Sequence, residues 1–276
     1  MKEVYSAPWD TNVLAVSCFV PAQFKLLEYT RDRTLQFRSV PEGTIAPFLP
    51  CDLGDNRSDE VNLVISGDGR LAAAASQGRV YVWDVATKAE VQQFQADPRS
   101  YEYGLYFSPD TTSLLARAED ARMTIWRLDS GRSFVLPGHK VEGNSLKFFR
   151  DGQRFVTTSL NGLVRLRDLT TERDFDSFDN GVGGCSDTAF SPDGQRLVFA
   201  AWAGVIQFWD LESKRQLATM RVCDHKQYIC YTAFLDENTL TSVFDDELRI
   251  WRAPSWAEIE GAEAVQAAAS LRKEQR

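Results

Sequence analysis

Short stretches in which apolar and polar residues alternate recur along the chain at a nearly constant spacing. Five of them, VYVWD, MTIWR, LVRLRD, VIQFWD and LRIWR, align in one column. The column, named the Trp column below, holds Trp83, Trp126, Arg167, Trp209 and Trp251, at successive spacings of 43, 41, 42 and 42 residues. Because alternation with period two indicates β-strands, and a fixed period indicates a repeat, the pattern predicts a β-rich repeat protein. A weaker copy, TLQFR, places Phe37 in the column 46 residues before Trp83 and makes six units.

A second recurring feature lies upstream of each column position, where a strand runs into a turn. The turns follow an apolar residue and contain Pro, Asp or Gly; the apolar residues are Phe19, Ile65, Phe107, Phe148, Phe190 and Phe234. Pro, Asp and Gly supply the backbone angles of a tight reversal, so each unit reads as about four short antiparallel strands. One such sheet cannot bury both faces, but sheets packed around an axis can. The sequence therefore predicts an all-β protein, a β-propeller of six four-stranded blades.

With both anchors recurring in register, residues 1–252 resemble the WD-repeat family. That family places a His, a Ser or Thr, an Asp and a Trp in a buried hydrogen-bond network within each blade, and the resemblance implies such a network for His225, Thr241, Asp245 and Trp251 in the last unit. In the fourth unit His139, Thr157 and Asn161 match, but Arg167 stands in place of Trp. The two histidines of the chain are then expected to be structural rather than catalytic.

The resemblance also implies how the ring closes. In this family the first strand of the chain completes the last blade, and the segment KEVYSAPWD, Lys2 to Asp10, precedes the first unit where that strand is expected. Closure would protect the edge of the last sheet from unwanted pairing. We therefore expect a propeller domain over residues 1–252, closed by the N-terminal strand. The alternative is an incomplete ring of seven blades.

A change of composition marks residues 253–276 as a separate tail. The tail is rich in Ala, Glu, Gln and Lys, and Ser255 and Glu258 form a capping-box pattern, so a short C-terminal helix is expected. The string WRAPSWAEIE resembles the end of repeat arrays in large bacterial signalling proteins that also carry kinase or other regulatory modules. That resemblance implies a role in a bacterial signalling or regulatory system.

Composition narrows the kinds of partner. The net charge of −8 opposes binding to nucleic-acid phosphates, and no apolar run is long enough to cross a membrane. The five cysteines include no CxxC pair, which favours a reducing compartment and a cytoplasmic location. No metal ion or other cofactor is expected, and protein partners remain.

Motifs of known chemistry are missing from the sequence. There is no GxSxG, no GxxxxGK[ST], no HExxH and no Asp-rich calcium loop. The glycine-rich stretch Gly181 to Gly184 lies between two expected strands without a following helix, so a flexible turn between blades is favoured over a phosphate site. Asp245 and Asp246 fall in a tight turn, where Asp is common. We therefore expect that the protein is not an enzyme.

The expected partner site is an arc of apolar residues on the loops of the fourth to sixth units. Counting back from the Trp column gives Leu160, Trp202 and Phe244, and a neighbouring loop column adds Tyr228. Clustered aromatic side chains are typical anchors of protein interfaces. Trp202 and Phe244 could instead fold inward and plug the ring. The sequence thus predicts a non-catalytic scaffold or sensor module. The alternatives are a small-ligand-binding or enzymatic propeller that uses its central channel, and a structural spacer of a larger polypeptide.

Overall fold

The computed structural model describes residues 13–20, 25–39, 43–51, 53, 61–76, 78–96, 104–117, 122–139, 143–201, 204–222, 229–244 and 247–253. The chain divides into two compact units. The first unit comprises Met1–Gly143, Arg150–Phe155 and Arg167–Phe175, and the second comprises Asn144–Phe149, Val156–Leu166 and Asp176–Arg276. Both the N-terminal segment expected to close the ring and the tail expected to be helical lie outside the described residues.

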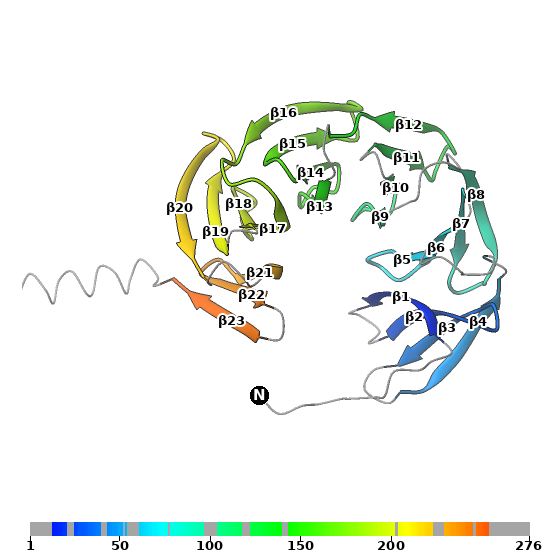
Figure 1. Ribbon diagram of the computed structural model, residues 1–276. Coiled ribbons are helices and arrows are strands. Elements are labelled where there is room, and N and C mark those ends of the chain that lie inside the picture. The colour runs from blue at the N-terminus through cyan, green and yellow to red at the C-terminus, as the bar shows by residue number, and fades with distance from the viewer. Residues whose placement is uncertain are drawn as a thin grey trace, which may run out of the picture. The chain divides into compact units, whose positions relative to one another are not determined.

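All regular structure in the described ranges is β-strand, arranged in six antiparallel sheets whose strands follow chain order (Figure 1). The first sheet contains β1 (Val13–Val20), β2 (Lys25–Thr30), β3 (Thr34–Ser39) and β4 (Ile45–Pro50). The second contains β5 (Asn62–Ile65), β6 (Leu71–Ser76), β7 (Arg79–Asp84) and β8 (Glu90–Gln95). The third contains β9 (Gly104–Phe107), β10 (Ser113–Arg117), β11 (Met123–Arg127) and β12 (Ser133–Leu136).

The remaining sheets repeat the same order. The fourth contains β13 (Gly143–Phe148), β14 (Arg154–Ser159), β15 (Leu163–Asp168) and β16 (Arg173–Asp179). The fifth contains β17 (Cys185–Phe190), β18 (Arg196–Ala201), β19 (Val205–Asp210) and β20 (Arg215–Arg221). The last contains β21 (Ile229–Asp236), β22 (Thr239–Phe244) and β23 (Glu247–Arg252), which are three strands among the described residues. The all-β fold of repeated, mostly four-stranded sheets confirms the predicted fold class.

The Trp column has a structural meaning, because each tryptophan packs on the preceding sheet. In the first unit, Trp83 joins an apolar cluster with Leu27 and Tyr29 of the first sheet, and Trp126 joins one with Val80 and Val82 of the second. In the second unit the pattern continues: Trp209 packs with residues of the fourth sheet and Trp251 with residues of the fifth. The column therefore marks the face that each sheet turns to its predecessor.

Phe37 does not belong to this column, so the sequence interpretation of the first repeat was wrong by one residue. Phe37 pairs with Leu27 and packs toward the second sheet, together with Trp83. Arg38 pairs with Leu26, and this spacing of 12 residues is also found between Leu114 and Trp126 and between Leu197 and Trp209. Because one residue of shift exchanges the two faces of a strand, Arg38 is the residue that corresponds to Trp.

Arginine in the Trp column is held by polar groups of its own unit. Arg38 Nε lies 2.6 Å from Glu28 Oε1, and Gln36 Nε2 donates to Glu28 Oε2 at 2.8 Å. Arg167, which is 0% exposed, donates from Nη2 to the carbonyl of Pro137 at 2.6 Å, and its Nε lies 3.4 Å from Asp174 Oδ1. A buried guanidinium is tolerated where carboxylates and carbonyls pair with it, so these two sheets replace the indole by a charged network.

Candidate functional site

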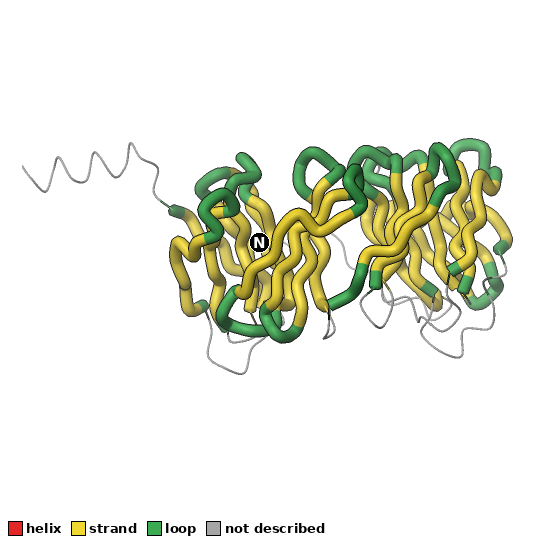
Figure 2. Tube along the Cα trace, turned by 90° about the horizontal axis from the view of Figure 1, so that it is seen from above, coloured by secondary structure: helices red, strands yellow, loops and turns green. Residues whose placement is uncertain are grey.

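The antiparallel order decides which loops share an edge of a sheet. Turns between the first and second strands, and between the third and fourth, lie at one edge, and the turn between the second and third strands lies at the other. Loops occur at both ends of the strands (Figure 2). Leu160 follows β14, so it belongs to the second kind of turn, at the same edge as the connection from β16 to β17. We name residues 160–162 and 180–184 together the Leu160 loop pair.

Asn180 is the centre of the Leu160 loop pair. Asn180 is 1% exposed. Its Oδ1 accepts hydrogen bonds from the backbone N–H groups of Val182 at 3.0 Å and Gly183 at 3.1 Å. Its Nδ2 donates to the carbonyl of Gly183 at 3.0 Å and to Cys185 Sγ at 2.9 Å. These bonds satisfy the amide and hold the connection in one shape, in contrast to the flexible turn expected from its glycines.

The two loops are also joined to each other. The backbone N–H of Asn180 donates to the carbonyl of Gly162 at 3.0 Å. A Cβ on Gly162 would lie 2.6 Å from Asn180 Oδ1, and the φ of Gly162 is +87°, so only glycine fits here. Leu160 begins the first of the two loops and is partly buried. Its carbonyl oxygen lies 3.6 Å from where a Cβ of Gly183 would be. The Leu160 loop pair is thus a fixed platform for Leu160.

The same hydrogen bonds explain why this glycine-rich stretch is a poor phosphate cradle. A phosphate loop offers several free backbone N–H groups to the anion. Here the N–H of Gly181 donates to Asp179 Oδ1 at 2.7 Å, and those of Val182 and Gly183 are taken by Asn180. Burial also raises the pKa of the Cys185 thiol to about 12, although its bond from Asn180 acts in the opposite direction. The thiol is therefore neutral and unsuited to nucleophilic attack at neutral pH.

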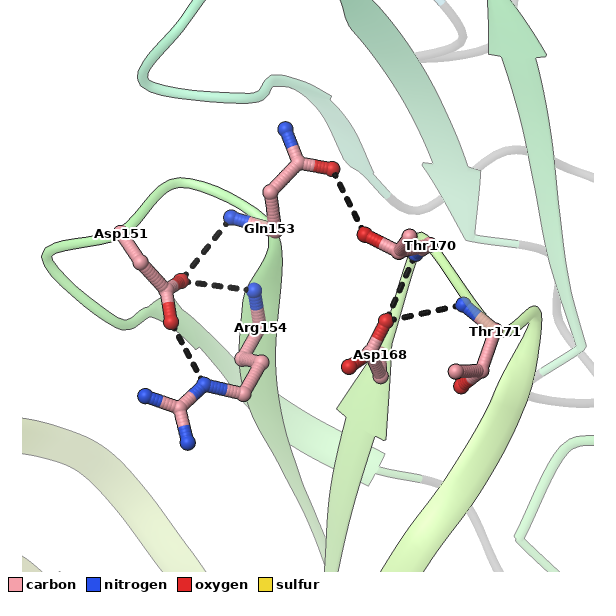
Figure 3. Close-up of polar contacts among 6 residues, drawn as sticks. All are labelled: Asp151, Gln153, Arg154, Asp168, Thr170 and Thr171. Carbon is pink, nitrogen blue, oxygen red and sulfur yellow. Dashed lines mark hydrogen bonds and ion pairs between the residues drawn. The ribbon is translucent and has the colours of Figure 1, made fainter.

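The opposite edge of the sheets carries turns whose polar groups serve their own backbone (Figure 3). Asp151 accepts from the N–H groups of Gln153 and Arg154, each at 2.9 Å, and Asp168 accepts from those of Thr170 at 2.7 Å and Thr171 at 2.9 Å. Thr170 Oγ1 and Gln153 Oε1, 3.4 Å apart, link the two turns.

Equivalent turns in other sheets use the same chemistry. Ser191 donates its hydroxyl to Asp193 at 2.5 Å, and this hydrogen bond holds the pKa of Asp193 below its ordinary range. The hairpin turns after Ile65, Phe107, Phe148, Phe190 and Phe234 are confirmed as turns between consecutive strands. Because their carboxylates already bind backbone amides, this edge offers few groups to a ligand.

The structure reaches only part of the predicted sites. Trp202, Tyr228, His225 and Asp245 lie outside the described residues, and Phe244 is described only as the last residue of β22. Of the predicted arc, Leu160 is therefore the residue whose surroundings are known. The arc and the network as wholes stay predictions.

Two residues of the expected network in the last sheet are described, and each has a partner that the sequence did not indicate. Trp251 Nε1 donates to Ser242 Oγ at 2.7 Å, and Thr241 Oγ1 donates to the carbonyl of Ala233 at 3.1 Å. The hydroxyl that Trp251 uses is thus that of Ser242, the residue after Thr241. In the fifth sheet, Trp209 Nε1 donates instead to Gln207 Oε1 at 3.2 Å.

No group of three or more His, Cys, Asp or Glu residues that could hold a metal ion occurs among the described residues. They contain no helix that is long and apolar enough to cross a membrane.

Comparison with known proteins places these repeats among propellers. The chain resembles a solved structure, the β-propeller domain of Cps50 (Swd1) from Myceliophteria thermophila, with a TM-score of 0.69 and 16% identity over 91% of this chain and 85% of that one. At this identity the likeness concerns the fold, which is that of a β-propeller. Residues 131–168 match the family "WD domain, G-beta repeat".

Curated relatives carry the same repeats. U3 small nucleolar RNA-associated protein 12 of Saccharomyces cerevisiae is 25% identical over 181 residues, covering 62% of this chain and 18% of that protein. The guanine nucleotide-binding protein subunit beta of Oryza sativa subsp. japonica is 29% identical over 136 residues, covering 44% of this chain and 36% of that protein. This chain thus spans well under half the length of either relative. Together with the repeated sheets, these matches support a WD-repeat β-propeller.

Proposed function

We propose that this propeller is a non-catalytic scaffold that binds another protein at the loop edge carrying Leu160. The observation that supports the proposal is the Leu160 loop pair, where a buried Asn180 fixes two loops and leaves Leu160 partly exposed above them. Fixed loops that present an apolar side chain lose little entropy on binding. Trp202, Phe244 and Tyr228 complete the proposed arc. WD-repeat propellers in general act as platforms for protein partners, and the relatives include a subunit of a larger protein.

The setting of this scaffold is a further part of the proposal. The C-terminal string WRAPSWAEIE supports a bacterial signalling or regulatory system, and five cysteines without a CxxC pair favour the cytoplasm. The relatives described above come from yeast and rice, so they lend no support to a bacterial origin.

The experiment compares partner capture and stability in the same variants. Leu160→Ala and Trp202→Ala are each expected to weaken capture at least about tenfold, which corresponds to about 1.4 kcal/mol. Trp202→Ala should change the melting temperature by no more than about 2 °C, as expected for a surface residue. Val135→Ala is the matched control, because Val135 is 55% exposed on β12 and belongs to the other compact unit.

A different outcome would contradict the proposal. A Trp202 that plugs the ring predicts a loss of about 3–5 kcal/mol of stability from the cavity left behind. If both variants keep stability and full capture, or if Val135→Ala weakens capture as much as Leu160→Ala does, the arc is not the partner site.

A further inference from the structure

Each loop of the Leu160 loop pair contains an asparagine followed by a glycine. Asn161 precedes Gly162 in one loop and Asn180 precedes Gly181 in the other, and these are the two Asn-Gly pairs of the whole sequence. Glycine has no side chain to shield its backbone nitrogen, so this nitrogen can approach the side-chain carbonyl carbon of the asparagine before it. For this reason asparagine loses its amide in water most readily before glycine. The loop pair therefore holds both sites of the chain that are most prone to this reaction.

The reaction is intramolecular and needs only water and hydroxide as co-reactants. The glycine N–H gives its proton to hydroxide, and its nitrogen attacks Cγ of the asparagine, which forms the N–Cγ bond of a succinimide ring. The Cγ–Nδ2 bond breaks, and the side-chain nitrogen takes up a proton from water and leaves as ammonia. Water then opens the ring at one of its two carbonyls. Opening at Cγ gives aspartate, whereas opening at the backbone carbonyl gives isoaspartate, in which the main chain is one carbon longer.

The surroundings of Asn180 protect it from this reaction. Its Oδ1 and its Nδ2 have two partners each, so turning the side chain toward Gly181 would break four hydrogen bonds in a buried site. The N–H that would have to lose its proton is that of Gly181, which donates to Asp179 Oδ1 at 2.7 Å. A carboxylate that accepts from an N–H group stabilises its protonated form, so attack by this nitrogen is opposed.

Asn161 is held less firmly. It is exposed, and its Oδ1 accepts from Ser159 Oγ and, at 3.4 Å, from the backbone N–H of Leu163. The N–H of Gly162 donates to a neutral acceptor, the carbonyl of Ser159, at 3.1 Å. Because Asn161 is exposed, water can replace the partners of its side chain when that side chain turns toward Gly162. We propose that Asn161 is a site of spontaneous deamidation in the folded protein, whereas Asn180 is protected.

Deamidation of Asn161 would disturb the platform that presents Leu160. Gly162 has little room to move, because a Cβ here would lie 2.6 Å from Asn180 Oδ1 and 3.1 Å from Asp179 Oδ1. Its carbonyl also accepts the N–H of Asn180 at 3.0 Å. An isoaspartate lengthens the main chain directly before Gly162, and either product adds a negative charge to a region that already holds the Asp179 carboxylate. The reaction would thus be a slow, irreversible switch of the Leu160 loop pair. Its effect on partner binding rests on the proposed function, but the reaction itself does not.

Peptide mapping of the full chain measures the two sites separately. Cleavage after arginine places Asn161 on residues 155–165 and Asn180 on residues 174–196. When the folded protein is aged at mildly alkaline pH, mass spectrometry should show deamidation at Asn161 at least about tenfold faster than at Asn180, which corresponds to about 1.4 kcal/mol in activation free energy. In denaturant, where neither side chain is held, the two sites should react at similar rates. The unfolded chain is the matched control for the intrinsic reactivity of each site.

Two variants test the consequence for the loops. The aged chain should melt at a lower temperature and capture its partner less well than the fresh chain. Asn161→Ala chains, aged in the same way, should show no such change relative to their own fresh sample. Asn161→Asp supplies the charge without the longer main chain, so the fresh variant should melt at a higher temperature than the isoaspartate form isolated from the aged chain.

Three results would overturn the proposal. The two sites could react equally fast in the folded chain, Asn161 could stay intact while the denatured chain reacts, or the deamidated chain could melt at the same temperature as the fresh chain. If Leu160→Ala leaves partner capture unchanged, the proposed partner site fails, whereas the peptide rates and the melting temperatures still decide whether Asn161 deamidates and what the reaction does to the loops.

Discussion

Replacing Asn180 by alanine is the sharpest test of how the Leu160 loop pair is held. The substitution removes the acceptor of the Val182 and Gly183 amides and the donor to the carbonyl of Gly183 and to the Cys185 thiol. Asn180 is 1% exposed, so water does not readily replace these partners. Its own backbone bond to Gly162 remains possible, which confines the damage to the side-chain network.

The size of the effect follows from the groups left without partners. A buried polar group that loses its hydrogen bond costs about 1–3 kcal/mol, and part of this is recovered where the loop relaxes toward solvent. We expect the free energy of unfolding to fall by about 2–4 kcal/mol. For a domain of this size each kcal/mol corresponds to about 2–4 °C, so the melting temperature should fall by about 5–10 °C.

Two measurements check this expectation. Urea denaturation should show a lower midpoint, and hydrogen exchange should become faster at the amides of Val182 and Gly183, which lose their acceptor. Asn161→Ala, in the other loop of the pair, is the control. Asn161 is exposed and its Oδ1 accepts from Ser159 Oγ, so a loss under about 1 kcal/mol is expected. An unchanged midpoint with unchanged exchange at both amides would refute the argument that Asn180 fixes these loops.

Two further predictions concern buried polar groups. Replacing Arg167 by Trp, the common residue of the column, should destabilise the protein by about 2–4 kcal/mol in thermal or urea denaturation. The Pro137 carbonyl and Asp174 would lose a cation, and the larger ring would have to fit a filled site. Equal or higher stability would contradict the charged-network account. Burial raises the pKa of the Cys185 thiol to about 12. Iodoacetamide at pH 8 should therefore label Cys185 in the folded protein at least about tenfold more slowly than the partly exposed Cys51. Equal labelling of the two cysteines would contradict the burial of Cys185.

Periodicity was sufficient to predict the sheets and the way they pack. Trp83, Trp126, Trp209 and Trp251 were aligned from spacing alone, and each packs on the preceding sheet. This works because a large apolar residue recurs only where the same contact recurs. Turn residues such as Asp151 were equally readable, since Asp binds the backbone two and three residues ahead in its own sequence.

Register was not readable where the spacing itself changed. Arg38 holds the column position of the first sheet, at the same 12-residue separation from its partner as in the third and fifth sheets. It lies 45 residues before Trp83, a longer spacing than the later ones, and Phe37 beside it seemed to match. A shift of one residue reverses the face of every side chain in a strand, and hydrophobicity alone favoured the wrong residue. Likewise, Trp251 donates to Ser242, the residue after the Thr241 that the resemblance placed in the network.

Polar partners in the Trp column differ from sheet to sheet, and this is why the site was harder to predict than the fold. Trp209 uses Gln207, Trp251 uses Ser242, and Arg167 uses the Pro137 carbonyl. Each partner satisfies the same physical requirement, that a buried donor be paired, by a local solution. A repeat pattern reveals the requirement but not the solution. The same reasoning applies to Asn180: a buried amide beside three glycines becomes visible only when the chain is folded, although it fixes the loops on which the proposed binding site depends.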